Sequence, residues 1–295
     1  MSEIMKAVIL GGKARVAVSD TTDIVNQSIQ MHQLSPLAAA ALGRTLTAGA
    51  YLSSNLKGKK DKYSIVVNGG GPLGKIVVAG EAGCNVRGFV ENPYVELPYK
   101  NGKLDVGGAV GKNGDITIIK DLGLKEPYVG VSKLVSGEIA EDFASYLLKS
   151  EGITAAVALG VLTDMRGCRA AGGVIVEAMP DATDEDIIIL EDIMTNFSGI
   201  SSMLAEKSAK QIMDFYFGHL DAEIFPSQKI TLQCHCKKKI EGVVRSLGRN
   251  EAESIIAESG KIEVRCDFCN TVYTFHQDEL DKLFGRAHGN HSKFK

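Results

Sequence analysis

The chain has 295 residues, of which 44% are hydrophobic and 23% are charged, close to the averages for soluble globular proteins. A chain of this length buries a sizeable core without disulfides, and its six cysteines are too few for a disulfide scaffold. The formal net charge of −3 and the lack of tryptophan are not the profile of a dedicated nucleic-acid-binding protein. Because no apolar run reaches about 18 residues and no signal peptide is recognisable, we expect a cytoplasmic protein without a membrane span.

Residues 1–179 alternate between strand and helix patterns. Apolar runs bounded by Gly, Asn and Pro predict strands, and Ser35 followed by Pro36 predicts the start of a long helix rich in alanine and leucine. The predicted strands are 5–10, 14–19, 63–68, 75–79, 86–90, 115–120, 129–133, 153–162 and 171–178, and the predicted helices are 37–56 and 138–150. Many strands joined by short turns favour an α+β fold with a mixed sheet over a doubly wound parallel sheet.

Residues 69–75, Gly-Gly-Gly-Pro-Leu-Gly-Lys, contain both G-x-G-x-x-G and the G-x-x-x-x-G-K part of a phosphate-binding loop. Such a loop must open a helix, whereas residues 75–79 are predicted as a strand. Ile76 also stands where the second motif requires Ser or Thr. We therefore interpret residues 69–74 as a hairpin turn.

Isolated histidines and cysteines in the first 231 residues give no sign of catalysis. His32 and His219 stand in helical patterns without a neighbouring nucleophile motif, and Cys84 and Cys168 have no partner cysteine nearby. We interpret the two histidines as structural or surface residues and the two cysteines as buried, unreactive thiols. No catalytic motif is visible, so we expect a protein that is not an enzyme.

Residues 180–230 are predicted to form an acidic helical linker. The segment carries ten acids against three lysines, a net charge of −7, and Thr183 before three acids marks a helix start. Further helices are expected over 201–206 and 208–217. The apolar residues assigned to a client-binding face are Ile187, Leu190, Met194, Phe197, Met203, Ile212, Phe215 and Tyr216. This face is expected either to pack on the first domain or to become exposed in another state and bind varied partners. The two interpretations are compatible.

The last quarter of the chain carries the strongest motif. Cys234 and Cys236 form a C-x-C pair, and Cys266 and Cys269 form a C-x-x-C pair after an interval of 29 residues. Two close pairs at such a separation are the arrangement of a closed tetrahedral zinc site, in which four thiolates fill every position. An extended chain places residues i and i+2 on one face, so both sulfurs of the first pair can reach one metal. The sequence therefore predicts one Zn²⁺ ion held by these four cysteines.

Residues 231–295 are expected to form a small module that depends on its metal. Helical spacing predicts a helix containing Ile240 and Val244, and Asn250 with Glu253 resembles the capping box of a second helix. Only 24 of the 64 residues from 232 to 295 are hydrophobic, and four of these are cysteines. A unit with so few hydrophobic residues has only marginal stability by itself. Structural zinc contributes on the order of 10 kcal/mol of apparent folding free energy. Conversion of either cysteine pair to a disulfide would remove two ligands and this stabilisation.

Two alternatives remain open at the metal site. His235 or His276 in place of one cysteine is a second possible ligand set. A permanently reduced structural zinc ribbon uses the same four thiolates as a redox sensor, so the ligand type does not distinguish the two.

The chain resembles the heat shock protein 33 family, which consists of bacterial redox-regulated holdase chaperones. The resemblance runs through essentially the whole chain. It is carried by the C-x-C and C-x-x-C pairs, by residues 265–270 with Tyr273 and Phe275, by residues 126–130, by residues 172–176 with Met179-Pro180, and by the helix at 42–57.

The resemblance implies an N-terminal α/β chaperone domain at 1–179, a helical linker at 180–230 and a zinc-binding redox-switch domain at 231–295. In such proteins the reduced, zinc-bound form is largely inactive. Oxidation pairs neighbouring cysteines, here Cys234 with Cys236 and Cys266 with Cys269, and zinc is released. The linker then loosens and exposed apolar surface binds unfolding client proteins without ATP, usually with homodimerisation. The resemblance thus implies a stress-response chaperone that binds neither nucleic acid nor membranes.

Two other functions are compatible with the motifs. The run 237–239, three lysines beside the first pair, suggests a zinc-ribbon nucleic-acid-binding protein, although the 64-residue module carries a charge of only +2, from 11 basic and 9 acidic residues. A thiol oxidoreductase could use Cys266-x-x-Cys269, but catalytic pairs usually open a helix in a βαβ unit, which residues 270–275 do not suggest.

Overall fold

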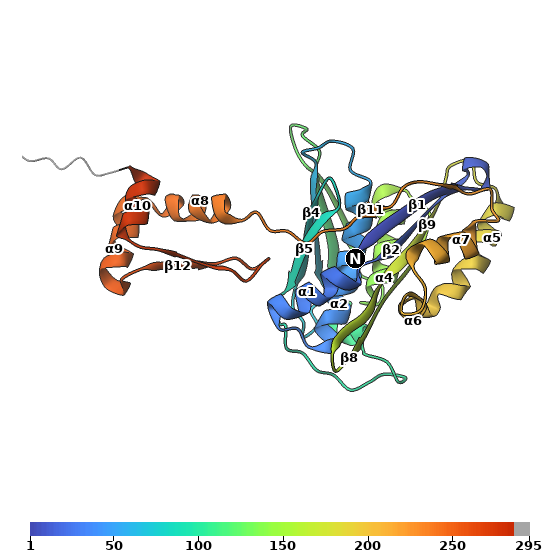
Figure 1. Cartoon of the computed structure of the whole chain (residues 1–295), viewed down its shortest axis with the longest axis horizontal. Coiled ribbons are helices and arrows are strands. Elements are labelled where there is room, and N and C mark those ends of the chain that lie inside the picture. The colour runs from blue at the N-terminus through green and yellow to red at the C-terminus, as the bar shows by residue number, and fades with distance from the viewer. Residues whose placement is uncertain (286–295) are drawn as a thin grey trace, which may run out of the picture. The chain divides into compact units, whose positions relative to one another are not determined.

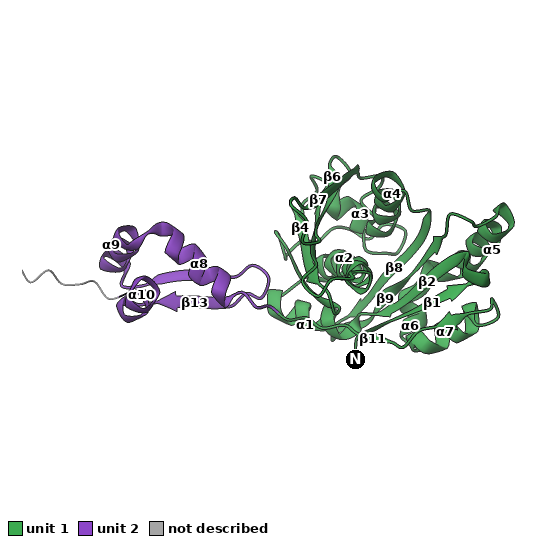
Figure 2. Ribbon diagram, turned by 90° about the horizontal axis from the view of Figure 1, so that it is seen from above, with its two compact units in different colours: residues 1–233 green, residues 234–295 purple. Residues whose placement is uncertain are grey.

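The structure is a computed structural model that describes residues 1–285 and divides into two compact units, Met1–Gln233 and Cys234–Lys295 (Figure 2). Each unit has a hydrophobic core of its own. The first unit contains both the predicted N-terminal domain and the predicted linker, and the second begins at the first cysteine of the C-x-C pair. Helices and antiparallel sheets are mixed in the first unit, which confirms the predicted α+β class.

One sheet of the first unit contains five antiparallel strands in the order β5-β4-β3-β6-β7. The strands are β3 (Lys62–Asn68), β4 (Ile76–Glu81), β5 (Asn85–Val90), β6 (Asp115–Asp121) and β7 (Tyr128–Lys133). The glycine-rich segment 69–75 joins β3 to β4 as a turn, as predicted. A Cβ atom at Gly71 would collide with the backbone of the short helix α3 (Val106–Val110). This glycine therefore allows the turn to pack closely against α3, and the segment is not a phosphate-binding loop.

The second sheet contains six strands, with β10-β1-β2-β9-β8 in order and β11 also paired to β1. The strands are β1 (Glu3–Ile9), β2 (Ala14–Asp20), β8 (Ala155–Asp164), β9 (Gly167–Ala178), β10 (Glu223–Ile224) and β11 (Gln228–Lys229). The β1–β2 hairpin and the closing β8–β9 pair confirm two predictions from the sequence. A 3-10 turn, η1 (Leu10–Gly12), connects β1 to β2.

Helix α2 (Pro36–Ser54) lies between the two sheets (Figure 2). The Ser35 hydroxyl accepts a hydrogen bond from the Ala38 N–H group, and Pro36 occupies the first turn, as the sequence predicts. A Cβ atom at Gly49 would lie 2.7 Å from the Tyr63 hydroxyl, so the glycine lets the helix approach β3 closely. Helices α1 (Thr22–His32) and α4 (Ile139–Glu151) complete this layer.

The predicted linker packs on the other face of the six-stranded sheet (Figure 1). It contains α5 (Asp184–Thr195), the 3-10 turn η2 (Asn196–Gly199), α6 (Ile200–Leu204) and α7 (Ala209–Phe217). Thr183 and Asp186 form a capping box at the start of α5, and Ser208 with Gln211 forms another at α7. The apolar sides of these helices and the outer face of β1, β2 and β9 share one core. The six-stranded sheet is therefore covered by helices on both faces.

One helical segment of the described residues, Asp184–Leu204, is long and apolar enough by length and composition to cross a membrane. It is interrupted by η2, and five of its apolar side chains are buried in the core it shares with the sheet: Leu190, Ile193, Phe197, Ile200 and Leu204. Burial of one side only is what an amphipathic helix packed on a globular domain shows.

The described part of the second unit, residues 234–285, is built from three helices and a two-stranded hairpin. Its elements are α8 (Lys237–Leu247), α9 (Arg249–Ser259), β12 (Ile262–Arg265), β13 (Val272–Phe275) and α10 (Gln277–Phe284). The predicted capping box of Asn250 and Glu253 is wrong. Helix α9 starts at Arg249, two residues before the start that a cap at Asn250 implies, and Gly248 with a φ of 81° precedes it. The Glu253 carboxylate instead accepts a hydrogen bond from the Arg249 guanidinium at 2.7 Å.

Candidate metal centre

Four cysteine sulfurs meet in the second unit. The Sγ atoms of Cys234, Cys236, Cys266 and Cys269 all lie within 4.8 Å of one another. The Sγ–Sγ distance is 3.8 Å between Cys234 and Cys266 and 3.5 Å between Cys236 and Cys269. Four Zn–S bonds of about 2.3 Å at tetrahedral angles would space the sulfurs by about 3.8 Å. The donor atoms and their spacing therefore fit a tetrahedral thiolate site of the kind that zinc forms.

Two local structures position these sulfurs. Cys236 is the N-cap residue of α8, and its carbonyl oxygen accepts the hydrogen bond of the Ile240 N–H group at 2.9 Å. The Cys266 N–H group donates to the Thr271 carbonyl at 3.0 Å, and the Cys266 carbonyl accepts from the Asn270 N–H group at 2.7 Å. Asn270 has a φ of 56°, a left-handed conformation that asparagine tolerates well. The chain thus reverses tightly between β12 and β13, with the C-x-x-C pair in the turn.

Two hydroxyl groups reach the sulfur cluster from the strand side of the module. The Tyr273 hydroxyl lies 3.2 Å from Cys236 Sγ, and Thr271 Oγ1 lies 3.3 Å from Cys269 Sγ. No motif in the sequence predicted these contacts. The alternation of side chains along an extended chain is a usable signal for them, because residues 271, 273 and 275 then point to one face.

The four thiols do not share one environment. Burial, followed by hydrogen bonding with neighbouring cysteines, raises the pKa of Cys234, and burial also raises the pKa of Cys266. At Cys269 burial acts in the same direction. Hydrogen bonds with the side chain and backbone of Thr271, together with those to Cys236 and Cys266, outweigh burial and lower the pKa of Cys269 to about 7. The lysines at 237–239 form the exposed first turn of α8 directly after Cys236, where their positive charges favour thiolates.

Among residues 1–285 the structure groups only the four cysteines as a metal-binding cluster, so it gives no support to a histidine ligand. His276 is the N-cap residue of α10, and its backbone N–H group donates to the Glu279 carboxylate at 3.0 Å. His235 lies between the two cysteines of the first pair and is exposed. The alternative ligand sets that include a histidine are therefore not supported.

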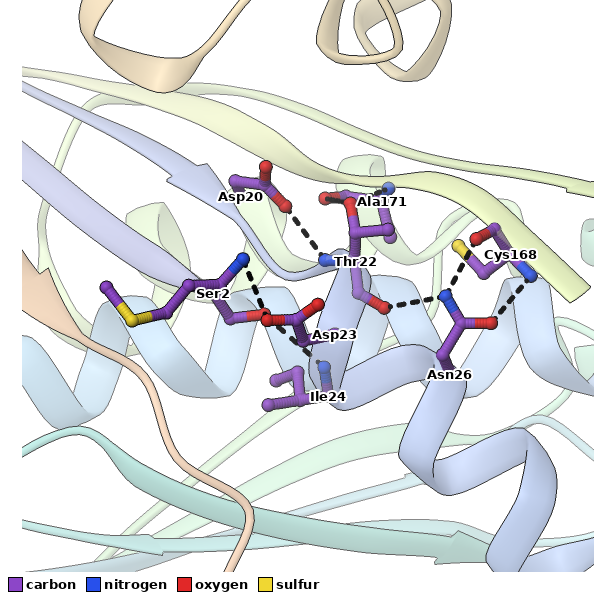
Figure 3. Close-up of polar contacts among 9 residues, drawn as sticks. Ser2, Asp20, Thr22, Asp23, Ile24, Asn26, Cys168 and Ala171 are labelled. Carbon is purple, nitrogen blue, oxygen red and sulfur yellow. Dashed lines mark hydrogen bonds and ion pairs between the residues drawn. The ribbon is translucent and has the colours of Figure 1, made fainter.

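The two other cysteines are buried in the first unit, as expected. The Cys84 thiol donates to Gln228 Oε1 at 3.1 Å, and burial raises its pKa. Burial raises the pKa of Cys168 to about 12. The amide of Asn26 holds the backbone of Cys168 on both sides, accepting from its N–H group at 3.0 Å and donating to its carbonyl at 2.7 Å (Figure 3). Both thiols are disfavoured as thiolates, which agrees with their interpretation as unreactive.

The predicted client-binding residues divide into buried and exposed groups. Leu190, Phe197 and Ile212 are buried in the core between the linker helices and the six-stranded sheet. Phe215 is 71% exposed. The partly buried members are Ile187, Met194, Met203 and Tyr216. Most of the predicted face is thus covered in this state by the first unit's own sheet.

Comparisons with known proteins agree with the geometry. A family model described as Hsp33 protein matches residues 2–276. A 33 kDa chaperonin from Clostridium botulinum is 44% identical, over 95% of this chain and 97% of its own length. Another from Alkaliphilus metalliredigens is 41% identical, over 96% of this chain and 98% of its own length.

A solved structure gives the same result. The crystal structure of the 33 kDa chaperonin (heat shock protein 33 homologue) from Thermotoga maritima matches with a TM-score of 0.87 at 34% identity, over 95% of this chain and 97% of that chain. The family model and the relatives both extend across the two units rather than over one of them. The chain therefore belongs to the heat shock protein 33 family.

Proposed function

We propose that this chain is a redox-regulated, ATP-independent holdase chaperone. Membership of a family of non-enzymatic chaperones supports the chaperone function, and the relatives are named 33 kDa chaperonin. The four-cysteine cluster supports metal binding and redox control. Neither the family match nor these relatives favour the nucleic-acid-binding alternative.

The observation that carries the proposal is the position of the cysteines within the core of the small unit. Cys236 and Cys266 are two of the eight buried core residues found in its described part, and Cys234 and Cys269 pack against the same core. Bound zinc cross-links both ends of the module and is expected to supply much of its stability. Loss of the ligands therefore removes part of the core itself.

Oxidation converts ligands into disulfides. In each pair two thiolates form one S–S bond and give up two electrons to hydrogen peroxide, whose O–O bond breaks to yield two hydroxide ions. We propose that sequence neighbours pair, Cys234 with Cys236 and Cys266 with Cys269. All four sulfurs lie within 4.8 Å of one another, so peptide mapping of the oxidised protein tests this pairing directly.

Unfolding of the module would act on the segment that precedes it. Residues 223–233 are held by the two-residue strands β10 and β11 on β1, and by Thr231, which pairs with Asn85 at the start of β5. Such short pairings are weak by themselves. We propose that this segment and the linker helices loosen once the module unfolds, and that the uncovered face bearing Leu190, Phe197 and Ile212 binds unfolded proteins.

The remaining parts of the proposal concern the oligomeric state and the cellular compartment. We propose that activation is accompanied by homodimerisation and that the protein works in the cytoplasm. Light scattering during size-exclusion chromatography of reduced and oxidised protein tests the first part.

The decisive experiment follows aggregation of a heat-denatured client protein. Reduced, zinc-loaded chain is expected to protect poorly, and chain treated with peroxide and heat is expected to suppress light scattering. Zinc content and free thiols are measured on the same samples, with a fall from one zinc and four coordinated thiols to none. Equal protection by both forms, with zinc retained, would refute redox control.

A further inference from the structure

Tyr273 connects the strand hairpin of the small unit to its first cysteine pair. It lies in β13 opposite Val264 of β12, and its ring packs against the module's core. Phe275, two residues later on the same face of the strand, is buried in that core. The ring of Tyr273 is thereby held in place, and its hydroxyl lies 3.2 Å from Cys236 Sγ.

The direction of this hydrogen bond follows from the chemistry of the site. A cysteine that holds a metal ion does so as a thiolate and has no proton to donate. The Tyr273 hydroxyl must then donate to Cys236 Sγ, as outer hydrogen-bond partners of metal ligands commonly do. Cys236 is only 7% exposed, so water cannot readily replace a donor that is removed.

The other hydroxyl at the cluster provides a contrast. Thr271 lies 3.3 Å from Cys269 Sγ, but Thr271 is exposed and Cys269 is only partly buried. Water can take the place of the Thr271 hydroxyl, whereas the site around Cys236 offers it little access. Removal of the Tyr273 hydroxyl should therefore weaken zinc binding more than removal of the Thr271 hydroxyl.

We infer that Tyr273 is a positioning residue: its hydroxyl holds Cys236 Sγ in the metal-binding orientation and slows the loss of zinc from the cluster. The inference rests on one part of the proposed function, zinc binding by the four cysteines. It means that Tyr273, which is not a zinc ligand, controls how readily the four cysteines release zinc. Because a hydrogen bond also reduces the electron density on sulfur, its removal is expected to make Cys236 easier to oxidise.

The test uses the full chain with Tyr273→Phe, which removes the hydroxyl and keeps the ring. Loss of an outer hydrogen-bond partner is expected to lower the zinc affinity about tenfold, measured by competition with a chromogenic chelator. Zinc release under a fixed concentration of peroxide should be faster than in the wild type. Tyr94→Phe is the matched control, since Tyr94 is 74% exposed in the first unit, and it should behave as the wild type. Thr271→Val should have a smaller effect than Tyr273→Phe.

Thermal unfolding in saturating zinc completes the test. Tyr273→Phe should still bind one zinc and unfold as the wild type does under this condition. Unchanged zinc affinity and release rate would overturn the inference, as would a variant that stays unfolded in saturating zinc, because Tyr273 would then be a core residue rather than a positioning residue.

The zinc measurements on Tyr273→Phe and wild-type protein involve no client protein. They therefore test the role of Tyr273 separately from the holdase function. A wild-type chain that binds zinc but gives no client protection after oxidation would refute the holdase proposal and leave the Tyr273 result standing. A wild-type chain that binds no zinc would overturn both.

Discussion

Each sulfur of the cluster serves both the metal and the core of the small unit. Cys266 is buried in that core, and serine in its place has a similar volume but is a poor zinc ligand. If the four ligands contribute equally to a zinc-binding free energy on the order of 10 kcal/mol, each contributes about 2.5 kcal/mol. Loss of one ligand then corresponds to roughly a 100-fold change in zinc affinity. We expect Cys266→Ser to lower zinc affinity by about this factor in chelator competition. Cys168→Ser, at a buried cysteine of the first unit, is the control, and equal zinc loss in both variants would contradict the assignment.

Asp186 attaches the first linker helix to the β1–β2 turn. Its carboxylate accepts hydrogen bonds from the Thr183 N–H and hydroxyl groups, each at 2.8 Å, and from the Lys13 ammonium at 3.0 Å. The Thr183 backbone and side chain, followed by Lys13, lower the pKa of Asp186 to about 2. A carboxyl group whose pKa is lower in the folded state stabilises that state above its ordinary pKa, and this contribution is lost as the pH falls toward 2.

The matching prediction is a pH-dependent difference in stability. We expect Asp186→Asn to lower the urea midpoint of the first unit at pH 5. The gap from the wild type should narrow by pH 3, because the unfolded chain binds a proton at this carboxyl below its ordinary pKa while the folded chain still holds it ionised. Asp214→Asn removes an exposed carboxylate paired with Lys210 on α7 and should change the midpoint little. A gap that is constant between pH 5 and pH 3 would show that the charge of Asp186 does not contribute.

The residues found from the sequence and those that were missed differ in how their contacts arise. The four cysteines were identified because residue type and spacing together define a zinc site. The contact of Asp186 with Lys13 joins residues 173 positions apart, and that of Tyr273 with Cys236 joins residues 37 apart. Such pairs depend on how separate elements pack. A local pattern, such as the alternation along the strand that holds Tyr273, shows which residues share a face but not which distant residue they meet.

At the scale of elements, an aromatic cluster joins η2 to α7 within the core that the linker helices share with the six-stranded sheet. Phe197 is 1% exposed, and its ring centroid lies 5.8 Å from that of Phe217 and 4.9 Å from that of Tyr216. Phe197→Ala is expected to cost about 3–5 kcal/mol of folding free energy. Because Phe197 lies in the core that the linker helices share with the sheet, the free energy of local opening of these helices should fall more than that of the rest of the unit.

The functional result expected for Phe197→Ala is client binding by the reduced protein. Protection of a heat-denatured client should appear without peroxide, with zinc still bound. Hydrogen exchange should be faster in α5–α7 than in β3–β7. Phe215→Ala is the control, because Phe215 is already exposed and its loss should not loosen the helices. Reduced Phe197→Ala protein that opens in hydrogen exchange but does not protect the client would exclude this face as the client surface.

Most elements could be predicted because their signals are local. Runs of apolar residues between turn residues identified β3–β7, and Ser35-Pro36 identified the start of α2. Helix α3 was missed because it has only five residues, two of them glycines. The start of α9 was misplaced because Gly248, with its positive φ, begins the helix without a side-chain cap. The linker helices were expected, but which of their residues are buried depends on the sheet beneath them.

At the scale of the whole molecule, the two units are stabilised by different means. The first has a large apolar core between two sheets and a second core under the linker helices. Over residues 234–285 the second has eight buried core residues, two of which are cysteines. The large unit should therefore remain folded without metal, and the small one should not.

Removal of zinc is expected to separate the two units in thermal unfolding. With a strong chelator under reducing conditions, the transition of residues 234–285 should disappear, while the strands β1–β9 keep their protection in hydrogen exchange. Oxidation with peroxide should give the same pattern, because both treatments abolish ligation by the same four thiolates. Readdition of zinc to the reduced, chelator-treated protein should restore protection in α8–α10, whereas the oxidised protein should need a thiol reductant first. Simultaneous loss of structure in both units would mean that the large core depends on the metal, contrary to what its composition implies.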